Sequence, residues 1–557
     1  MIGPGWFDRT TALRRLADDP FDLLVVGGGI TGAGTALDAV SRGLRTALIE
    51  RDDFASGTSS KSSKLVHGGL RYLQQGEFRL VYEALHERQR LRHNAPHLVK
   101  ILPFLLPVFT GRGGVIPKKL ARALGSAMWL YDLTGGARIG KLHQRITPDE
   151  AVAHMPTLNR SRLSSSYLYY DAQADDARLT LTIARTAAID FGAVVANGVA
   201  LIGVDKDPSG RVTGARVVAD GREISVRCSA VVNATGVWSD DVRALDEGAH
   251  PNSIRPAKGI HITVPWSKIR NDIAAVIPVP KDKRSVFVVP WGDFTYVGTT
   301  DTDYDGPVDD PQCTAEDVAY LLSAINNAVT NELTDRDVLG TWAGLRPLVN
   351  REDSGRTADL SRRHKVHTSP SGVVTITGGK LTTYREMAAD TVDVVLRSLD
   401  HGAATRVAKR SRTKNLRLRG AEGYEAARLA GDPLTVHLAD RYGGEARTVR
   451  AMIDAEPSLG EPLVAGLPYV RAEAVYAARY EMARTVDDVL SRRTRARLLN
   501  RDASAAAAGD VAELIGEVLG LTADERAAQA SAYRDAVAAE RSSAGLPETA
   551  LDAVLGA

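Results

Sequence analysis

A short glycine-rich segment near the start of the chain limits its possible folds more than any other feature. The pattern GxGxxG occupies residues 27–32, directly after the apolar run 21–26. It opens the stretch 30–42, whose apolar residues recur at helical spacing, and a second apolar run, 45–49, ends at Glu50. Strand, glycine turn, helix and strand in this order predict a βαβ unit, which requires a parallel sheet and a right-handed crossover.

Each glycine of this segment has a physical role. Gly27 permits a tight turn, Gly29 lets the backbone approach a pyrophosphate, and Gly32 allows helix and strand to pack closely. The free N–H groups at the helix N-terminus then face the phosphates. At the end of the second strand, Glu50 can accept hydrogen bonds from ribose hydroxyls and would repel a 2′-phosphate. A glycine turn that serves only helix packing would leave Glu50 without a role, so we expect a dinucleotide site.

The residues that follow favour FAD over NAD. The segment 58–64 is rich in hydroxyl groups and leads into His67 and two glycines, so it offers backbone and side-chain donors along an extended cofactor. The alternative is that this segment forms a flexible loop. Ala-Thr-Gly at 234–236, after an apolar run, resembles the second contact of flavoproteins with two dinucleotide-binding domains.

Length and composition set wider limits. With 557 residues, 44% of them hydrophobic, the chain can bury a large core and is expected to form more than one domain. Lys plus Arg (70) nearly cancel Asp plus Glu (68), which argues against nucleic-acid binding. Two cysteines, Cys228 and Cys313, are too few for a disulfide framework and lack metal-ligand spacing, so no metal is expected. No apolar window reaches the about 18 residues of a membrane-spanning helix, and residues 1–20 do not form a signal peptide.

The order of apolar runs predicts an α/β architecture. Further strands are expected at 230–232 and 373–376, a hairpin from 286–290 and 296–299, and a helix at 176–190. We expect an FAD-binding Rossmann-like domain interleaved with an antiparallel-sheet substrate domain within residues 21–404. The expected FAD-binding segments are about 21–95, 160–245 and 340–404, and the expected substrate-binding segments are about 96–159 and 246–339.

Beyond about residue 405 the sequence changes character. Strand-like runs disappear, and Ala, Arg, Glu and Leu dominate. Amphipathic helices are expected at 470–490 and 509–519, with 503–508 as a linker or a helix start. Residues 405–557 are therefore predicted to form an all-helical C-terminal domain.

Several separated blocks resemble the FAD-dependent, quinone-reducing glycerol-3-phosphate dehydrogenases, known in bacteria as the GlpD family. They span roughly residues 21–390 in the family's order, and the region around 484–500 resembles the family's helical domain less specifically. The blocks are GGGITGAG (27–34), TSSKSSKLVHGGLRYL (58–73), DDARL (175–179), VNATGVW (232–238), KGIHITVP (258–265), VFVVPW (286–291), GTTD (298–301), GLRPL (344–348) and GGKLTTYR (378–385).

This resemblance implies oxidation of sn-glycerol 3-phosphate to dihydroxyacetone phosphate, with hydride passing from C2 to flavin N5. It also implies that a membrane quinone accepts the electrons, that the protein is cytoplasmic and peripheral on the inner face of the cell membrane, and that it forms a homodimer. The composition itself says nothing about oligomeric state, the type of quinone or the role of the C-terminal domain.

A phosphate dianion requires cationic donors, and the planar guanidinium of arginine suits it best. Arg71, Arg346 and Lys380 each follow a glycine-containing block, which suggests loops that bring charge close to a flavin. Arg71 and Arg346, with Tyr72 as a hydroxyl donor, are the candidates for contacts to the phosphate and the C2 oxygen. Arg362 is a weaker substrate candidate, because its alignment to the family needs a gap of about two residues and a solvated basic loop fits equally well.

Hydride leaves a carbinol carbon more easily when a base takes the hydroxyl proton. His261, in the block KGIH, is the candidate base, since imidazole titrates near neutral pH. Its alternative role is that of a hydrogen-bonded strand histidine. Arg346 is a second candidate catalytic residue, as a stabiliser of a developing alkoxide. His67 is expected to pack near the flavin.

Lys380, Leu381 and Thr382 follow a glycine pair at an expected helix start. Their backbone N–H groups can face flavin O2, and Lys380 has the alternative of contacting substrate. The expected FAD-binding residues are Gly27, Gly29, Thr31, Gly32, Glu50, Thr58, Ser59, Ser60, Ser63, Lys64, Leu65, His67, Ala234, Gly236, Gly379, Lys380, Leu381 and Thr382.

Two other functions compete with this one. An oxidase of the same fold would return electrons to O2 and act on glycerol phosphate or on an amine such as an amino acid. In a non-catalytic FAD-binding protein, His261, Arg346 and Lys380 would have no reason to occur together.

Residues 98–133 are the expected membrane contact. They join the apolar run 101–109 to Lys118, Lys119 and Arg122 and then to a stretch with Trp129. The alternative is an ordinary buried loop and helix.

Overall fold

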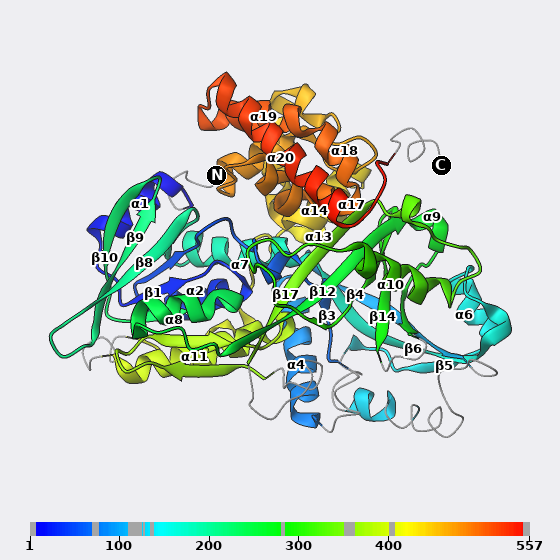
Figure 1. Ribbon diagram of the computed structural model, residues 1–557, viewed down its shortest axis with the longest axis horizontal. Helices are drawn as coiled ribbons and strands as arrows, with labels where there is room; N and C mark the ends of the chain where they lie inside the picture. Colours follow the sequence, from blue (N-terminus) through cyan, green and yellow to red (C-terminus); the bar gives the residue numbers. More distant parts are fainter. Residues whose placement is uncertain are drawn as a thin grey trace.

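The computed structural model has three parts: a parallel sheet with helices, a large antiparallel sheet, and a helical cluster that covers their junction (Figure 1). It describes residues 7–69, 77–109, 125, 128–133, 139–279, 284–349, 363–399, 407–429 and 431–549.

The first part is a six-stranded sheet in the order β18-β19-β11-β1-β2-β7. The five strands from β19 to β7 are parallel, and only β18 pairs antiparallel, with β19. Side chains of the central strands are buried on both faces, as in parallel sheets covered on both sides. The strands are β1 (Leu23–Val26), β2 (Thr46–Ile49), β7 (Val194–Ala196), β11 (Val231–Asn233), β18 (Lys365–Thr368) and β19 (Val374–Thr377).

Helices α2 (Ile30–Arg42), α7 (Asp176–Ile189) and α11 (Tyr384–Ser398) pack together on this sheet. Gly34 lets α2 and α11 approach, since a Cβ there would lie 2.6 Å from the Tyr384 ring. A three-stranded antiparallel sheet and two further helices complete this part. They are β8 (Val199–Lys206), β9 (Val212–Ala219), β10 (Arg222–Arg227), α1 (Arg9–Asp18) and α8 (Ser239–Glu247).

The second part is a ten-stranded sheet in the order β16-β12-β15-β14-β13-β4-β6-β3, with β17 paired to β12 and β5 to β6. Its strands pair antiparallel except β13 with β4. The strands are β3 (Leu65–Val66), β4 (Val99–Phe109), β5 (Gln144–Ile146), β6 (Leu163–Ala174), β12 (Ile254–Pro265), β13 (Ala274–Pro278), β14 (Ser285–Trp291), β15 (Phe294–Gly298), β16 (Thr302–Asp303) and β17 (Gly340–Val349). Its helices are α4 (Phe78–Asn94), α6 (Pro148–His154), α9 (Trp266–Ile269) and α10 (Ala315–Asn326).

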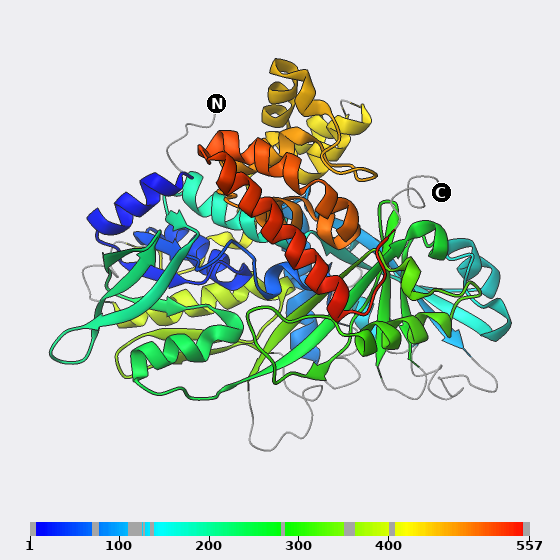
Figure 2. The ribbon, with the colours of Figure 1, turned by 45° about the horizontal axis from the view of Figure 1, so that its top comes forward.

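The third part is the C-terminal helical cluster, which has a core of its own (Figure 2). The end of its long helix α20 docks on β17, where the Glu540 carboxylate accepts hydrogen bonds from the Thr341 N–H (3.2 Å) and hydroxyl (2.8 Å). The helices are α13 (Tyr424–Leu429), α14 (Pro433–Tyr442), α15 (Ala446–Ala455), α16 (Arg471–Tyr480), the π-helical turn η11 (Asp488–Thr494), α17 (Ala496–Leu499), α18 (Arg501–Ala506), α19 (Ala508–Leu519) and α20 (Ala523–Ser543). Short 3₁₀ turns connect elements in all three parts: η1 (Thr58–Ser60), η3 (Arg160–Arg162), η4 (Gly236–Trp238), η5 (Asp335–Asp337), η7 (Leu381–Thr383), η8 (Thr413–Asn415), η9 (Gly443–Glu445) and η10 (Pro457–Gly460).

The α/β fold, the βαβ unit, the β14–β15 hairpin and the helical C-terminal part are confirmed. One helix over 470–490 is wrong, because α16 ends at Tyr480 and Met482 follows with a left-handed φ of 54°. Of the two expectations for 503–508, a linker is wrong and a helix start holds, because α18 ends at Ala506 and α19 starts at Ala508, with only Ala507 between them.

The expected domain boundaries differ from the sheets at three strands. The strands β3, β6 and β17 were expected in the FAD-binding segments but lie in the ten-stranded sheet, where β6 pairs with β3 and β4, and β17 with β12. The other boundaries stay a prediction. Across the described ranges, we find no helix that combines the length and the apolar character needed to traverse a bilayer.

Candidate functional site

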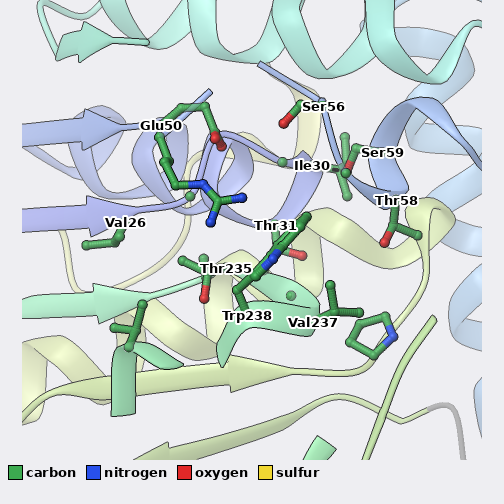
Figure 3. A pocket seen from close by; sticks show the side chains of 18 of the residues that line it. Val26, Ile30, Thr31, Glu50, Ser56, Thr58, Ser59, Thr235, Val237 and Trp238 are labelled. Carbon is green, nitrogen blue, oxygen red and sulfur yellow. Dashed lines mark hydrogen bonds between the residues drawn. The ribbon is translucent and has the colours of Figure 1, made fainter. Parts of the chain in front are cut away.

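A deep pocket opens where β1 and β11 end and α2 begins, which is the crevice where α/β sheets bind nucleotides. Glu50, Ser56, Ser59 and Thr58 follow one wall, and Thr235 and Trp238 lie opposite (Figure 3). Of the residues expected to contact FAD, the pocket is lined by Gly27, Gly29, Thr31, Glu50, Thr58, Ser59, Ala234, Gly236, Gly379, Lys380 and Leu381.

The glycine turn at the pocket floor tolerates no side chain at two positions. Gly27 has a φ of 108°, and a Cβ there would lie 2.7 Å from the Ala234 carbonyl oxygen. A Cβ on Gly32 would lie 1.8 Å from the Gly27 oxygen. The turn therefore holds the N-terminus of α2 against β1 and β11, and Gly27, Gly29, Ile30 and Thr31 line the pocket there.

Glu50 contributes a carboxylate to the pocket wall. One oxygen accepts a hydrogen bond from the Gly28 N–H (2.6 Å) and the other from the Asp52 N–H (2.9 Å). Burial raises the pKa of Glu50 to about 7, although both N–H groups oppose the rise. Each oxygen retains lone pairs, so the carboxylate can still accept hydrogen bonds from a ribose.

The hydroxyl groups of segment 58–64 mainly fasten this segment to the protein. Ser59 Oγ accepts a hydrogen bond from the Ile30 N–H (2.9 Å) and thereby caps α2, while Thr58 Oγ1 donates to the Leu345 carbonyl (2.6 Å). Ser63 Oγ lies 2.9 Å from His261 Nε2. The alternative of a flexible loop is wrong, because these bonds tie the segment to α2, β17 and β12.

Seven of the expected contacts lie outside the pocket lining: Gly32, Ser60, Ser63, Lys64, Leu65, His67 and Thr382. Lys64 is buried, with Nζ 3.1 Å from the Ser60 carbonyl and 3.3 Å from Asp176. Its side chain therefore binds other parts of the protein, behind the residues that line the pocket. Burial lowers its pKa to about 8, and Arg495 adds to this effect. Thr382 Oγ1 accepts a hydrogen bond from the His67 N–H (3.2 Å), which fixes the two segments to each other.

One end of the pocket could not be predicted from the sequence motifs. Arg51 lies over the Trp238 ring at 5.2 Å, and both side chains bind Asp309, each at 2.8 Å. Apolar side chains from β8 and α8 complete this end: Val199, Leu201, Val242 and Leu245. Only the position of Arg51 next to Glu50 signalled it, because β8 and α8 belong to no glycine motif.

The opposite end of the pocket is closed by the turn after β19. Gly378 and Gly379 have φ values of 73° and 84°, and a Cβ on Gly379 would lie 2.3 Å from the Met387 sulfur. Lys380 follows as the N-cap of η7, which continues into α11. Lys380 and Leu381 line the pocket as expected.

Arg346 lies immediately before Pro347, which lines the pocket. The expectation of a glycine loop here is wrong, since Arg346 is in β17, where Gly344 allows the strand to pass close to the Lys61 carbonyl. Its guanidinium binds Asp301 (3.1 Å), Thr299 Oγ1 (3.2 Å) and the Thr300 carbonyl (3.1 Å).

His261 lies on β12, the strand paired with β17, and is 2% exposed. Its ring stacks on Trp342 at 4.6 Å, and Nε2 meets Ser63. Burial holds the pKa of His261 well below its usual value, with Lys64 and Arg346 adding to the effect, so the imidazole is neutral at physiological pH. Within the described ranges, Nδ1 has no hydrogen-bond partner.

Three further substrate candidates, Arg71, Tyr72 and Arg362, lie outside the described residues. So do Lys118, Lys119 and Arg122 of the expected membrane contact. The apolar run 101–109 is strand β4, and Phe104 and Leu105 are fully buried within the sheet, so its expected exposure to a membrane is wrong.

Residues 22–385 match the family described as "FAD dependent oxidoreductase", and residues 411–526 match "C-terminal domain of alpha-glycerophosphate oxidase". The chain is 41% identical to "Glycerol-3-phosphate dehydrogenase 2" of Mycobacterium tuberculosis, over 98% of this chain and 93% of that protein. It is 40% identical to the human mitochondrial glycerol-3-phosphate dehydrogenase, over 90% of this chain and 70% of the relative.

Among solved structures, the glycerol-3-phosphate dehydrogenase from Bacillus halodurans complexed with FAD matches with a TM-score of 0.75 and 29% identity. The match covers 97% of this chain and 98% of that one. An L-α-glycerophosphate oxidase from Mycoplasma pneumoniae with FAD bound has a TM-score of 0.54 at 16% identity, which is a likeness of fold. The glycine turn, the carboxylate and the long pocket with an apolar end fit FAD.

Proposed function

Because the chain belongs to the family of FAD-dependent glycerol-3-phosphate dehydrogenases, we propose that it oxidises sn-glycerol 3-phosphate to dihydroxyacetone phosphate. The observation that carries this proposal is the course of the pocket. It runs from Glu50 to Lys380 and Pro347. The end away from the Glu50 carboxylate is therefore next to Arg346, which precedes Pro347.

Residues along the pocket would hold FAD in one direction. Glu50 would accept hydrogen bonds from the ribose, the N-terminus of α2 would bind the pyrophosphate, and Trp238 with Leu201 would flank the adenine. Lys380 would then contact the flavin. When bound, FAD supplies the acceptor for the hydride that leaves substrate C2, at flavin N5.

Arg346 and Lys380 would provide positive charge for the substrate. Asp301 and Thr299 hold the Arg346 guanidinium in place, which fixes its fork for an oxygen of the phosphate or the C2 oxygen. Arg71 and Tyr72 complete the proposed phosphate contacts, with Arg362 as a further one.

His261 would accept the C2 hydroxyl proton. Its Nε2–H can donate to Ser63 Oγ, and this tautomer leaves a lone pair on Nδ1. Because the imidazole is neutral but a weak base, the proton would transfer as the hydride departs rather than before. In the alternative, Arg346 stabilises the developing alkoxide.

We propose a membrane quinone as the electron acceptor and a contact with the membrane surface that keeps the end of the expected stretch, around Trp129, and adds α4. Met128 and Tyr131 pack with Val81 and Leu85 of α4 in one cluster. The outer faces of these two segments, at the lower edge of Figure 1, and the nearby segment after 139 expose large apolar side chains. They are Phe78 (49% exposed), Tyr82 (51%), Trp129 (56%), Leu133 (80%) and Leu142 (48%).

Anaerobic reduction of the bound flavin tests the substrate. Adding sn-glycerol 3-phosphate to the FAD-loaded protein without oxygen should bleach the visible flavin absorption. Glycerol, which lacks the phosphate, and glycine, which has an amine, should leave it unchanged. Bleaching by glycine alone would contradict the proposal.

The acceptor is tested by reoxidation. The reduced protein should be reoxidised rapidly by a quinone in vesicles and slowly by air. Stoichiometric peroxide, formed in air as fast as quinone reoxidises the protein, would instead favour an oxidase. An oxidase is also named in the description of the family that residues 411–526 match.

A further inference from the structure

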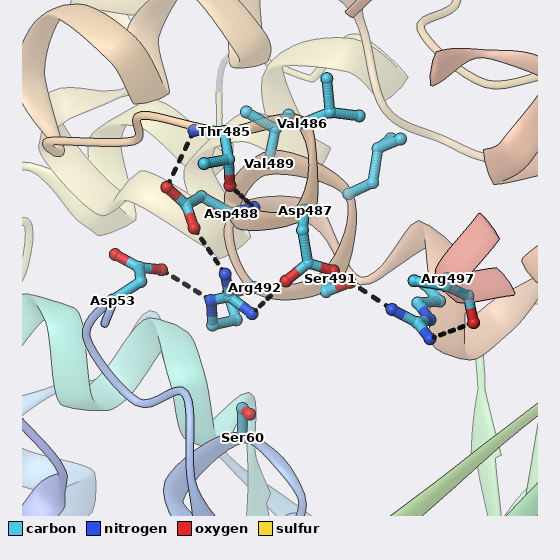
Figure 4. Close-up of polar contacts among 12 residues, drawn as sticks. Asp53, Ser60, Thr485, Val486, Asp487, Asp488, Val489, Ser491, Arg492 and Arg497 are labelled. Atoms are coloured by element: carbon cyan, nitrogen blue, oxygen red, sulfur yellow. Dashed lines mark hydrogen bonds and ion pairs between the residues drawn. The ribbon is translucent and has the colours of Figure 1, made fainter. Parts of the chain in front are cut away.

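The C-terminal helical domain reaches the wall of the FAD pocket through buried arginines. They lie on η11 and on the residue after it, and they bind the segment between β2 and β3. Figure 4 shows Arg492 directed at Asp53 of that segment. We refer to residues 50–64 as the wall segment. It has one 3₁₀ turn, η1, and otherwise no regular secondary structure, so its conformation depends on contacts with other parts of the chain.

The first contact anchors Asp53, which is 3% exposed. Arg493 binds both carboxylate oxygens, at 2.7 and 2.8 Å, and Arg492 Nε binds one of them at 2.6 Å. Burial alone would raise the pKa of Asp53, but the charges of Arg493 and Arg492 outweigh it and lower the pKa to about 2. The carboxylate is therefore ionised and bound by two guanidinium groups.

The second contact anchors the wall segment at Ser60. Arg495 Nη2 donates to the Ser60 carbonyl at 2.7 Å and to Asp176 at 2.6 Å. Asp176 also accepts a hydrogen bond from the Ser62 hydroxyl at 2.6 Å. Arg495 is 1% exposed and has a φ of 140°, a conformation that a non-glycine residue rarely adopts and that persists only where its surroundings enforce it.

The residues between these two anchors form part of the pocket. Ser56, Gly57, Thr58 and Ser59 all line it, and Ser59 also caps the helix whose N-terminus faces the pyrophosphate. Asp53 and Ser60 thus lie on either side of this stretch, and Glu50, Arg51, Asp52 and Ser62 of the same segment line the pocket as well.

We propose that Arg492, Arg493 and Arg495 are positioning residues for FAD, and that the helical domain holds the pocket wall in its binding conformation. Stability alone is a weak explanation, because buried ion pairs often add little over well-packed apolar residues. A role in geometry explains them better, because these three nearby arginines all bind the wall segment and so hold it in one conformation. This inference rests on FAD as the cofactor and is independent of the proposed substrate.

Asp53→Asn tests the proposal, with Glu445→Gln as the matched control. Glu445 is also a buried carboxylate at the boundary of the helical domain, bound by Arg185 (2.6 Å) and Arg419 (3.0 Å), and its pKa is likewise lowered to about 2. It contacts α7 rather than the wall segment. Both variants remove one buried charge from a pair of arginines, so both should lower the melting temperature of the apoprotein.

Only Asp53→Asn should weaken FAD binding. If the wall segment adopts its binding conformation in about one molecule in ten, the apparent Kd rises about tenfold. The Kd is measured by quenching of FAD fluorescence during reconstitution of the full-length apoprotein, well below its melting temperature. Visible circular dichroism of the bound flavin should change in Asp53→Asn and stay as in the wild type in Glu445→Gln.

Arg493→Lys provides a second, milder test, since it keeps the charge but loses the two-pronged contact. Its Kd should lie between those of the wild type and Asp53→Asn. Equal increases in Kd for Asp53→Asn and Glu445→Gln would overturn the proposal, as would a wild-type Kd in Asp53→Asn. If Asp53→Asn does not fold, a wild-type Kd and flavin spectrum in Arg493→Lys overturns it.

Discussion

Replacing Glu50 by glutamine tests how the pocket recognises the ribose. The ionised carboxylate of the apoprotein is held by two backbone N–H groups, and burial raises its pKa from 4.5 to about 7. Ribose hydroxyls donate to the ionised form, so FAD binding should lower this pKa again. The protein therefore has to lose a proton from Glu50 when FAD binds below pH 7.

The size of the effect follows from this linkage. A pKa near 7 in the apoprotein and one well below 5.5 with FAD bound predict an affinity about twentyfold weaker at pH 5.5 than at pH 7.5, and constant above pH 8. The same raised pKa affects stability with the opposite sign. The folded apoprotein favours the protonated acid, so this group's contribution is most favourable below pH 4.5 and is lost as the pH rises through 7.

Glu50→Gln removes the titration and one of the two acceptors. Losing the charged acceptor for a ribose hydroxyl costs about 1.5–3 kcal/mol of binding free energy, so FAD should bind about ten- to a hundredfold more weakly at pH 8. Its affinity should also no longer depend on pH between 5.5 and 7.5. Fluorescence titration of the apoprotein with FAD at several pH values measures both. A pH-independent wild-type affinity, or an unchanged slope in Glu50→Gln, would refute the reasoning.

Substitutions at five further positions test the other proposed roles. Arg346→Ala and Arg71→Ala should each lower kcat/KM about ten- to a hundredfold with FAD still bound, from the loss of a charge-assisted contact; Arg346→Lys should restore only part of it, and normal turnover in both alanine variants would show that the phosphate binds elsewhere. His261→Ala should slow flavin reduction in a single turnover, whereas the wild-type rate should show no histidine titration at pH 6 and above, because burial lowers the pKa of His261; a defect confined to reoxidation would exclude it as the base. Ser59→Ala should lower the free energy of unfolding by about 1 kcal/mol through loss of the α2 cap, measured by denaturant titration, and an unchanged midpoint would contradict that role. Leu133→Glu should reduce sedimentation with anionic vesicles and quinone activity while activity with a water-soluble dye persists; equal loss of both activities would point to misfolding.

The elements with a periodic or motif signal could be predicted from the sequence. The glycines at 27–32 predicted a tight turn, and Gly27 and Gly32 indeed leave no room for a side chain. The position of Glu50 at the end of β2 predicted that its carboxylate lines the pocket. The hairpin of β14 and β15 followed from two short apolar runs around a turn. In each case the determinants lie within one short continuous stretch of the sequence.

Long-range contacts account for what could not be predicted. Lys64 and Ser60 belong to a motif that suggested cofactor contacts. Instead, Lys64 binds Asp176 and the Ser60 carbonyl accepts from Arg495, and neither residue lines the pocket. The adenine end depends on β8 and α8, which are distant in sequence. The apolar run 101–109 carries no sign of whether a sheet or a membrane covers it, because both are apolar surroundings.

The most direct measurement of the central claim uses sn-glycerol 3-phosphate carrying deuterium at C2. The FAD-loaded protein is mixed rapidly with it in the absence of oxygen, and loss of the flavin absorption is followed in time. We predict slower flavin reduction than with the unlabelled substrate, and an unchanged rate when deuterium is at C1 or C3 instead. Equal rates with all labelled substrates in a reduction limited by chemistry, or no reduction at all, would contradict the assignment of this site to C2 oxidation.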